Sequence, residues 1–186
     1  MPAKSQDLFF IALVPPEPIN GELQKLKELF ATEYQSKASL NSPPHITLHM
    51  PFKLNPKKQG RLIQSLKEVT QKQTSFLVKI ENFKAFEPRV IYAHIHPSEE
   101  LNHLFEKLSR TLQVQVGLLH PSHKNKGFTP HITLAFRDLR KGAFHKAWAF
   151  FQSKMYEATF EANTLYLLKH DGKKWDIYQE FSFGTS

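Results

Sequence analysis

Two identical five-residue segments carry the side chains best suited to chemistry in this chain. Pro44-His45-Ile46-Thr47-Leu48 recurs unchanged as Pro130-His131-Ile132-Thr133-Leu134, 86 residues later. Side chains two positions apart on a strand point to the same face of the sheet. Each copy therefore predicts a strand that presents its histidine and threonine to one side, and its isoleucine and leucine to the core.

These four polar side chains suit acid–base chemistry on a phosphodiester. An imidazole titrates near pH 6.5, so one ring can be neutral and the other protonated, as a base and an acid on opposite sides of one reacting centre. Threonine hydroxyls can donate hydrogen bonds to the non-bridging oxygens of the phosphate and stabilise its charge in the transition state. A single copy is more often an ordinary strand, but two copies in one frame favour a site. We predict that His45, Thr47, His131 and Thr133 are catalytic, without a metal or cofactor.

Three nearby side chains are candidates for contact with the substrate phosphate. Lys53 and His49 have the same strand parity as the first histidine, so simple alternation places them on its face. Arg137 has the parity of the second histidine if that strand stays regular. A basic loop shortly before the second copy, with His120, His123, Lys124 and Lys126, could either contact phosphates or be an ordinary solvated loop.

Another strand carries Tyr92, His94 and His96 on one face. Tyr92 is a candidate for stacking on a base of the substrate. A His-x-His pair can contribute to a zinc site, but zinc takes three or four ligands and no carboxylate or cysteine partner is evident. We interpret the two histidines as part of a polar sheet face.

The composition narrows the class of protein. The chain has 186 residues and no cysteine, which excludes a disulfide scaffold, thiolate chemistry and iron–sulfur clusters, and is typical of a reducing compartment. Lys and Arg exceed Asp and Glu by 25 to 17, a net charge of +8 that favours RNA or phosphorylated metabolites as partners, although a basic surface can also be merely solvated. The apolar run from Leu8 to Val14 is far shorter than the roughly 20 residues of a membrane span. We expect a cytoplasmic protein that does not enter membranes.

The chain alternates predicted strands and helices. Apolar runs and alternation predict strands at Leu8–Val14, His45–Met50, Phe76–Phe83, Val90–His96, His131–Phe136, Tyr156–Glu161, Thr164–Lys169 and Trp175–Phe181. Helical spacing predicts helices within Pro18–Gln35, after Pro56, over Leu101–Leu112 and around Phe144–Phe151. No linker rich in Gly or Ser divides the chain, so we expect one α+β domain, residues 1–186, with two packed lobes. A pseudo-twofold between the lobes would bring both histidines and both threonines to one cleft.

The paired His-hydrophobic-Thr-hydrophobic strands resemble the two-histidine phosphoesterase superfamily, specifically its RNA 2′,3′-cyclic phosphodiesterase and 2′-5′ RNA ligase group. The opening strand at Leu8–Pro15 and the strand pair that ends in Arg89–Tyr92 are similar to that group as well. The resemblance implies a bilobal fold of two pseudo-symmetric lobes, each of mainly antiparallel sheet with helices outside, around a central cleft. It also implies metal-independent attack on a cyclic phosphodiester, with His131 as the base toward water and His45 as the acid toward the leaving oxygen.

One position departs from the group. Its ligase members commonly carry arginine five residues after the second histidine, where this chain has Phe136 followed by Arg137. We expect a monomeric enzyme that opens 2′,3′-cyclic phosphate ends of RNA or nucleotides to 2′-phosphates, with 2′-5′ RNA ligation as a further activity of the same chemistry. A phosphodiesterase for 2′-5′ linkages or another cyclic phosphate metabolite, and a non-catalytic module that binds RNA ends, remain alternatives.

Overall fold

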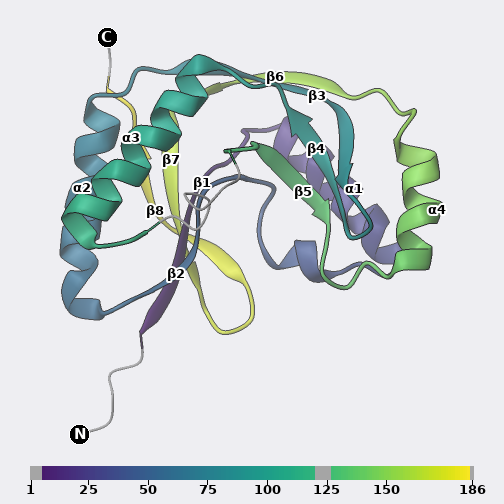
Figure 1. Cartoon of the computed structure of the whole chain (residues 1–186), viewed down its shortest axis with the longest axis horizontal. Coiled ribbons are helices and arrows are strands. Elements are labelled where there is room, and N and C mark those ends of the chain that lie inside the picture. Colours follow the sequence, from purple (N-terminus) through teal and green to yellow (C-terminus); the bar gives the residue numbers. More distant parts are fainter. Residues whose placement is uncertain (1–5, 120–126, 185–186) are drawn as a thin grey trace, which may run out of the picture.

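A single curled sheet organises the protein. The computed structural model describes residues 6–119 and 127–184, and eight strands in these ranges join into one antiparallel sheet (Figure 1). The basic loop predicted at His120, His123, Lys124 and Lys126 lies outside the described residues. In the part of the chain that is described, no helix is long and apolar enough to cross a membrane.

The elements follow the predicted order. The strands are β1 (Asp7–Leu13), β2 (Ile46–Leu54), β3 (Phe76–Phe86), β4 (Val90–Ile95), β5 (His131–Ala135), β6 (Glu157–Ala162), β7 (Thr164–His170) and β8 (Trp175–Ser182). The α-helices are α1 (Ile19–Glu33), α2 (Gln59–Gln71), α3 (Glu99–Val116) and α4 (Lys141–Phe151), and two short 3₁₀ helices are η1 (Ala38–Asn41) and η2 (Pro56–Lys58). The predicted α+β class is therefore confirmed.

The two ends of helix α3 are explained by the residues found there. In α3, the Ser98 side chain accepts a hydrogen bond from the backbone N–H of Leu101 at 3.2 Å, which satisfies a free donor of the first turn. The helix ends at Gly117, whose φ of 78° is the left-handed conformation that glycine adopts without strain. Between these ends, the buried leucines keep helical spacing and belong to the main apolar core, and the ring of Phe105 stacks on that of Phe128 at 4.1 Å.

The strand order shows the expected pseudo-twofold. The order is β6-β3-β4-β5-β2-β1-β7-β8, and the two halves meet where β5 pairs antiparallel with β2 at Ile46 and Ile132. The succession β1-α1-β2-α2 is repeated as β4-α3-β5-α4 on either side of this junction. We call the half with β1, β2, β7 and β8 the first lobe and the half with β3 to β6 the second lobe. The lobes thus share one continuous sheet rather than each closing its own.

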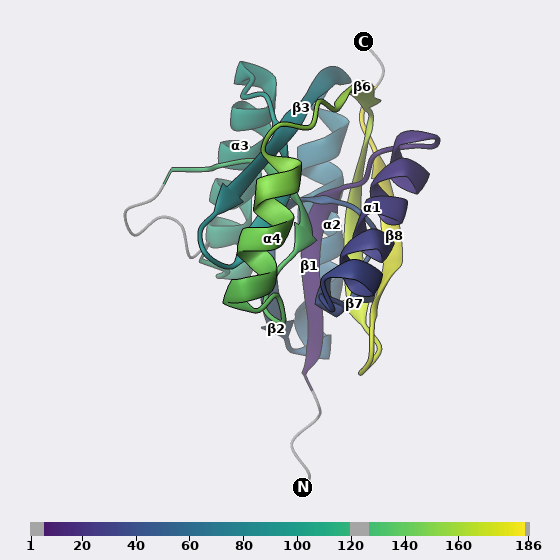
Figure 2. The same ribbon diagram turned by 90° about the vertical axis from the view of Figure 1, so that its right-hand side faces the viewer.

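The helices cover one face of the sheet and leave the other to the candidate site. Helices α2 and α3 pack together behind the first lobe, and α1 and α4 pack behind the second (Figures 1 and 2). The main apolar core lies between these helices and the sheet. A small separate cluster of Phe10, Ala12 and Leu168 lies on the opposite face, with Tyr166 and Trp175 packed against it. Helix α1 follows β1 of the first lobe but packs behind the second, and α3 follows β4 of the second lobe but packs behind the first, which ties the halves together.

Both copies of the repeat contain the same irregularity. Across β1 and β2, Ala12 pairs with Thr47 and Ile11 with His49, which leaves Leu48 as an extra residue. Across β4 and β5, Tyr92 pairs with Thr133 and Ile91 with Ala135, which leaves Leu134 extra in the same way. A bulge of this kind shifts the residues that follow it to the other face of the sheet. The pseudo-twofold therefore extends to the local backbone of the candidate site.

Candidate active site

The two histidines are held by the same backbone contact. Nδ1 of His45 lies 2.7 Å from the carbonyl oxygen of Pro43, and Nδ1 of His131 lies 2.8 Å from that of Thr129. A carbonyl only accepts, so each Nδ1 carries a proton and donates it. In a neutral ring, Nε2 then holds the lone pair. Both imidazoles are thus fixed in the tautomer that exposes a basic nitrogen to a substrate.

The strand junction brings the two histidines and the two threonines together. Because Ile46 faces Ile132 across antiparallel strands, the register sets Thr47 beside His131 and His45 beside Thr133. All four polar side chains are partly exposed, while the isoleucines and leucines of both copies are fully buried. The structure therefore places the predicted set on one face, in two histidine–threonine pairs that lie directly opposite each other across the two strands.

Burial makes both rings hard to protonate, and neighbouring positive charges add to this effect for His45. Burial lowers the pKa of His45 to about 4; the hydrogen bond to Pro43 opposes this shift, and the positive charges of Lys27 and His131 add to it. Burial also lowers the pKa of His131, against a raising contribution from its bond to Thr129. An anionic phosphate between the rings would favour their charged forms and raise both pKa values.

Lys27 is a buried cation behind the first histidine that the sequence reading did not single out. Its side chain on α1 is 1% exposed, and Nζ donates to the carbonyl oxygen of Ser42 at 2.5 Å. Burial lowers its pKa to about 7. The signal was present in the helix pattern, because Lys27 lies four residues after Leu23 and three before Phe30, and all three are buried. This contact supports the segment that leads into Pro43 and His45.

Aromatic rings pack against both histidines. Phe10 lies 4.6 Å from the ring of His45 and supports it from β1, while Trp175 meets Phe10 edge-on at 4.7 Å. In the second lobe, Tyr92 and Phe86 lie 5.0 and 5.3 Å from the ring of His131. Tyr92 is only 4% exposed, whereas Phe86 is 42% exposed. Phe86, which the sequence reading did not single out, therefore offers more open ring surface to a base than the predicted Tyr92 does.

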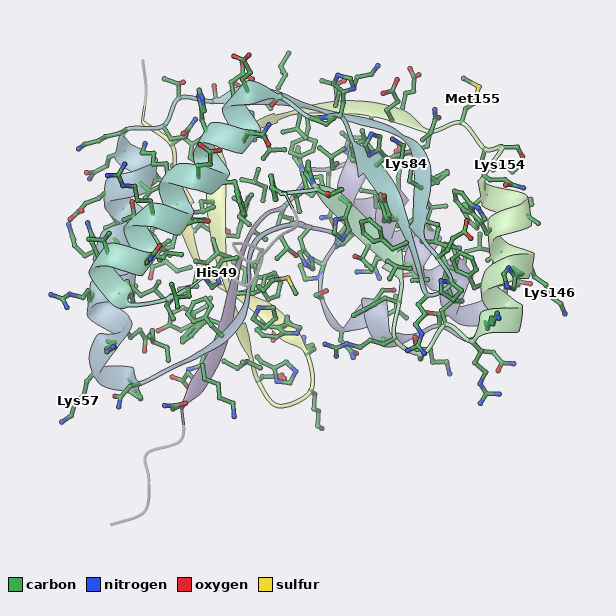
Figure 3. All side chains as sticks on the ribbon, viewed as in Figure 1. His49, Lys57, Lys84, Lys146, Lys154 and Met155 are labelled. Carbon is green, nitrogen blue, oxygen red and sulfur yellow. The ribbon has the colours of Figure 1, made fainter. Side chains whose placement is uncertain are left out.

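The bulge moves His49 away from the other predicted site residues. His49 pairs with Ile11 on the core side of β1, is 2% exposed and meets Phe52 edge-on at 5.0 Å (Figure 3). Its Nδ1 donates to the carbonyl oxygen of Met50 at 2.9 Å. The expectation that His49 shares the face of Thr47 is thus overturned, because Leu48 breaks the alternation. The matching residue of the second copy, Ala135, is buried in the same way.

The two other predicted phosphate contacts lie at the margins of the set. Arg137 does not continue β5, which ends at Ala135; its φ is 54° and its guanidinium lies 5.0 Å from the ring of Phe136. The prediction that Arg137 faces the phosphate required a regular strand through this residue, and the strand does not extend that far. Lys53 is exposed and pairs with Leu8, at the far end of β1 from Ala12 and Thr47. Its side chain still points to the same face as Thr47, because a second register shift between β1 and β2, between Phe9 and Ile11, offsets the bulge at Leu48.

A carboxylate that follows Arg137 ties the two motifs together. Asp138 accepts hydrogen bonds from the Ser36 hydroxyl at 2.9 Å and from the backbone N–H groups of Lys37 and Ala38 at 2.7 and 3.0 Å. The turn that ends β5 is thus anchored to the segment that leads toward β2. This contact accounts for the left-handed turn at Arg137, which directs the chain to its partner.

The polar row on β4 does not form a metal site. His96 lies 3.3 Å from a carboxylate oxygen of Glu81, and His94 contacts Lys84 rather than a further ligand. Among the described residues, no group of three or more His, Asp or Glu side chains is placed to hold a metal ion.

Comparison with known proteins agrees with this geometry. A sequence profile of the 2′-5′ RNA ligase superfamily matches residues 15–174. A protein of Geobacillus sp. (strain WCH70), named provisionally as a phosphoesterase, is 29% identical over 181 residues, which cover 94% of this chain and 95% of that one. TT0787 of Thermus thermophilus superposes with a TM-score of 0.68 at 18% identity, over 96% of this chain and 100% of that one. E. coli LigT complexed with 3′-AMP superposes with a TM-score of 0.67 at 15% identity, over 97% and 99%. The chain belongs to the 2′-5′ RNA ligase superfamily, and the predicted resemblance to two-histidine phosphoesterases is confirmed.

Proposed function

We propose that this phosphoesterase opens 2′,3′-cyclic phosphate ends of RNA or nucleotides and leaves 2′-phosphates. The observation that carries the proposal is the matched pair of Nδ1 hydrogen bonds, which gives His45 and His131 the same reactive nitrogen on one sheet face. Such a pair can serve an in-line displacement at phosphorus, in which the attacking and leaving oxygens lie on opposite sides. The crystal complex of LigT with 3′-AMP supports a nucleotide ligand for this fold.

The proposed step balances its protons between the two rings. Nε2 of His131 takes a proton from water as its oxygen bonds to phosphorus. The bond from phosphorus to the 3′ oxygen breaks, and the protonated ring of His45 donates its proton to that oxygen. The hydroxyls of Thr47 and Thr133 donate to the non-bridging oxygens, where charge develops. The assignment of base and acid follows the family resemblance; the step uses no metal ion.

Ligation fits the same geometry with a different attacking group. If the 5′-hydroxyl of a second RNA end replaces water, the same base and acid join the two ends through a 2′-5′ linkage by the reverse of linkage cleavage. The turn at Arg137 distinguishes this chain from the usual ligase pattern, so hydrolysis is the activity that we propose first. The expectation of a cytoplasmic monomer stays a prediction.

A substrate panel tests the proposal directly. The purified protein is incubated in EDTA with each of the four nucleoside 2′,3′-cyclic phosphates and with a short RNA that ends in a cyclic phosphate. Chromatography that separates 2′- from 3′-phosphates should show 2′-phosphate products. The same reaction with a 5′-hydroxyl RNA present reports ligation. Absence of turnover on the whole panel would contradict the proposal, and salt-sensitive RNA binding without product would favour a non-catalytic module.

A further inference from the structure

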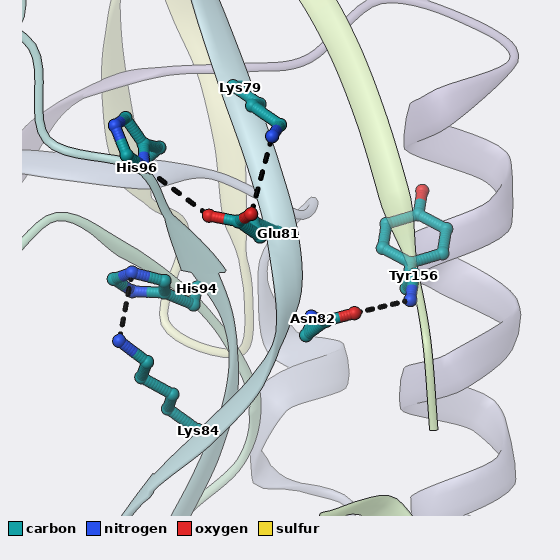
Figure 4. A network of polar contacts seen from close by, with 7 residues as sticks. All are labelled: Lys79, Glu81, Asn82, Lys84, His94, His96 and Tyr156. Carbon is teal, nitrogen blue, oxygen red and sulfur yellow. Dashed lines mark hydrogen bonds and ion pairs between the residues drawn. The ribbon is translucent and has the colours of Figure 1, made fainter. Parts of the chain in front are cut away.

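Two lysines project from β3, and their partners differ (Figure 4). Lys79 forms an ion pair with Glu81 at 3.3 Å, so a carboxylate compensates its charge. Nζ of Lys84 lies 3.1 Å from Nε2 of His94. An ammonium only donates, so Nε2 of His94 accepts and the ring is neutral. Lys84 is thus held in place by a partner that leaves its positive charge uncompensated.

The sheet register places Lys84 on the face of the candidate active site. Lys84 pairs with Tyr92 across β3 and β4, and Tyr92 pairs with Thr133 across β4 and β5. Paired residues on adjacent strands point to the same side. His94, which holds Lys84, is the direct cross-strand partner of His131, and such partners have Cα atoms about 5 Å apart. The Lys84 ammonium is therefore bent toward the strand beside the catalytic one.

The chemistry of this contact fits a second anion. A lysine ammonium has three N–H groups, and among the described contacts Lys84 uses one, on His94. Burial and the charge of Lys84 both lower the pKa of His94, which keeps the ring an acceptor in neutral solution. The remaining N–H groups of Lys84 can bind a phosphate oxygen on the sheet face that carries His131, two strand spacings or about 10 Å away.

The pseudo-twofold shows that this feature belongs to one lobe. Ala12 pairs with Thr47 as Tyr92 pairs with Thr133, and the residue beside Ala12 on β7 is Tyr166. The first lobe thus has a tyrosine where the second lobe has Lys84. Exact duplication would put the same residue at both positions. The lysine, present in the second lobe alone, therefore indicates the side of the reacting centre along which the rest of the substrate extends.

We propose that Lys84, positioned by His94, binds a second phosphate on the 5′ side of the nucleotide whose cyclic phosphate is opened. This inference rests on the proposed function and narrows its substrate class. The preferred substrate is a cyclic phosphate end that carries a 5′ phosphate, either the internal phosphodiester of an RNA chain or a 5′-phosphorylated nucleotide. A nucleoside 2′,3′-cyclic phosphate with a free 5′-hydroxyl is the poorer substrate.

The experiment compares uridine 2′,3′-cyclic phosphate, the same compound with a 5′-phosphate, and a dinucleotide with a cyclic end. The 5′-phosphate should raise kcat/KM about tenfold, the lower end of what one hydrogen bond to a charged group contributes. Lys84→Met should abolish this gain and leave the 5′-hydroxyl compound unaffected. His94→Leu should reduce the gain, because Lys84 loses its holder. A gain with the dinucleotide alone would identify the internal phosphodiester of RNA, rather than a terminal 5′-phosphate, as the group that Lys84 binds.

Two matched variants control for the loss of one positive charge. Lys79→Met removes a lysine that Glu81 already compensates, and Lys146→Met removes one on the outer side of α4, remote from the sheet face (Figure 3). Both should keep the gain, and circular dichroism should show that all variants are folded. A gain below twofold with both the 5′-phosphate compound and the dinucleotide in the unmodified protein, or an equal loss in Lys146→Met and Lys84→Met, would overturn the inference.

A binding measurement separates this inference from the proposed function. Calorimetry compares uridine 2′-phosphate with uridine 2′,5′-bisphosphate, which need no turnover. Tighter binding of the bisphosphate that depends on Lys84 supports the inference even if every cyclic substrate is inert. Equal affinities, together with no gain for the dinucleotide, overturn it even if the cyclic substrates are opened.

Discussion

The two lobes contain the same machinery in different surroundings. Each has the same pentapeptide, the same bulge at its leucine, and the same bond from Nδ1 to the carbonyl two residues earlier. The ring of His45 rests on the buried Phe10 and has the charge of Lys27 behind it. The ring of His131 lies beside the exposed Phe86, on a face that also carries Lys84.

The difference indicates how duplicated histidines can take unequal roles. The backbone sets the tautomer, and it does so equally in both lobes. The neighbours set the proton affinity and the contacts of the substrate, and these differ between the lobes. Burial lowers the pKa of both histidines, but only the first lobe adds the positive charge of Lys27, whereas the second has an exposed aromatic ring and a lysine beside its histidine. The pseudo-twofold thus accounts for the matched pair of histidines, and the differences between the lobes account for the orientation that we propose for the substrate.

The largest effect is expected when either histidine is replaced. His45→Ala and His131→Ala should each reduce kcat by roughly 10²- to 10⁴-fold, because each variant loses proton transfer on one side of the phosphorus. The double variant should be hardly worse than either single one, since the two rings act as a unit. Single-turnover assays with a cyclic nucleotide measure all three losses.

Folding of these variants is the necessary control. Both rings lie on the face opposite the helices, and the adjacent Ile46 and Ile132 hold the core side, so the melting temperature should change little. A folded His131→Ala protein that kept more than a tenth of the activity would break the comparison, because the two lobes would then not share one reaction.

A smaller effect is expected from the hydroxyls. Thr47→Ala and Thr133→Ala should each raise the barrier by about 2–4 kcal/mol, the contribution of one donor to a developing charge. The register sets each hydroxyl directly across from the histidine of the other copy, so equal losses would show that the phosphate sits on the pseudo-twofold. Thr→Ser variants, which keep the hydroxyl, should retain most activity. Loss of activity in Thr→Ser equal to that in Thr→Ala would contradict a donor role.

The pH dependence probes the charges behind the first histidine. Burial lowers the pKa of both rings, that of His45 to about 4, so kcat/KM should pass through a maximum below pH 6.5, where one ring is protonated and one neutral. Bound phosphate raises both pKa values, so the profile of kcat should lie at higher pH. Lys27→Met removes a positive charge near His45 and should move the acid limb of kcat/KM upward by less than one pH unit. A maximum above pH 8 would contradict this assignment.

The same variant has a stability readout. The pKa of Lys27 is about 7 in the folded protein and 10.5 ordinarily, so between these values the unfolded chain binds a proton that the folded one does not. The free energy of unfolding should therefore rise with pH over this window and carry the full penalty below pH 7. Lys27→Met should flatten the rise and be more stable than the unmodified protein at pH 7. Melting curves from pH 6.5 to 10 measure both, and parallel curves for the two proteins would contradict the buried charge.

Sequence patterns predict much of this fold because its elements are strongly periodic. Eight apolar or alternating runs became the eight strands, and the four helical faces became α1 to α4. The four proposed catalytic side chains follow from one repeat, since a strand puts a histidine and the threonine two positions later on one face. The four side chains then lie together because the strands of the two copies, β2 and β5, are neighbours in the sheet.

Two features could not be read from alternation. The residues of both pentapeptides alternate perfectly, yet each strand bulges at its leucine, a backbone choice that depends on the neighbouring strand. The strand of the second copy ends at Ala135 because the chain turns to place Asp138 against Ser36, a contact more than 100 residues away in sequence. Long-range pairing of this kind decides where Arg137 lies, and local residue patterns do not record it.

The smallest expected effect sharpens the comparison most closely. Alternation groups His49 with the catalytic face, whereas the bulge puts it on the core side beside Phe52, where its counterpart is Ala135. His49→Leu should therefore change kcat/KM by less than twofold. Leucine fills a similar volume but loses the hydrogen bond to Met50, so the free energy of unfolding should fall by about 1 kcal/mol. Denaturant curves and the cyclic nucleotide assay measure the two quantities on one preparation. A tenfold loss of activity with unchanged stability would mean that His49 reaches the substrate, and that the two lobes differ in their catalytic groups as well as in their surroundings.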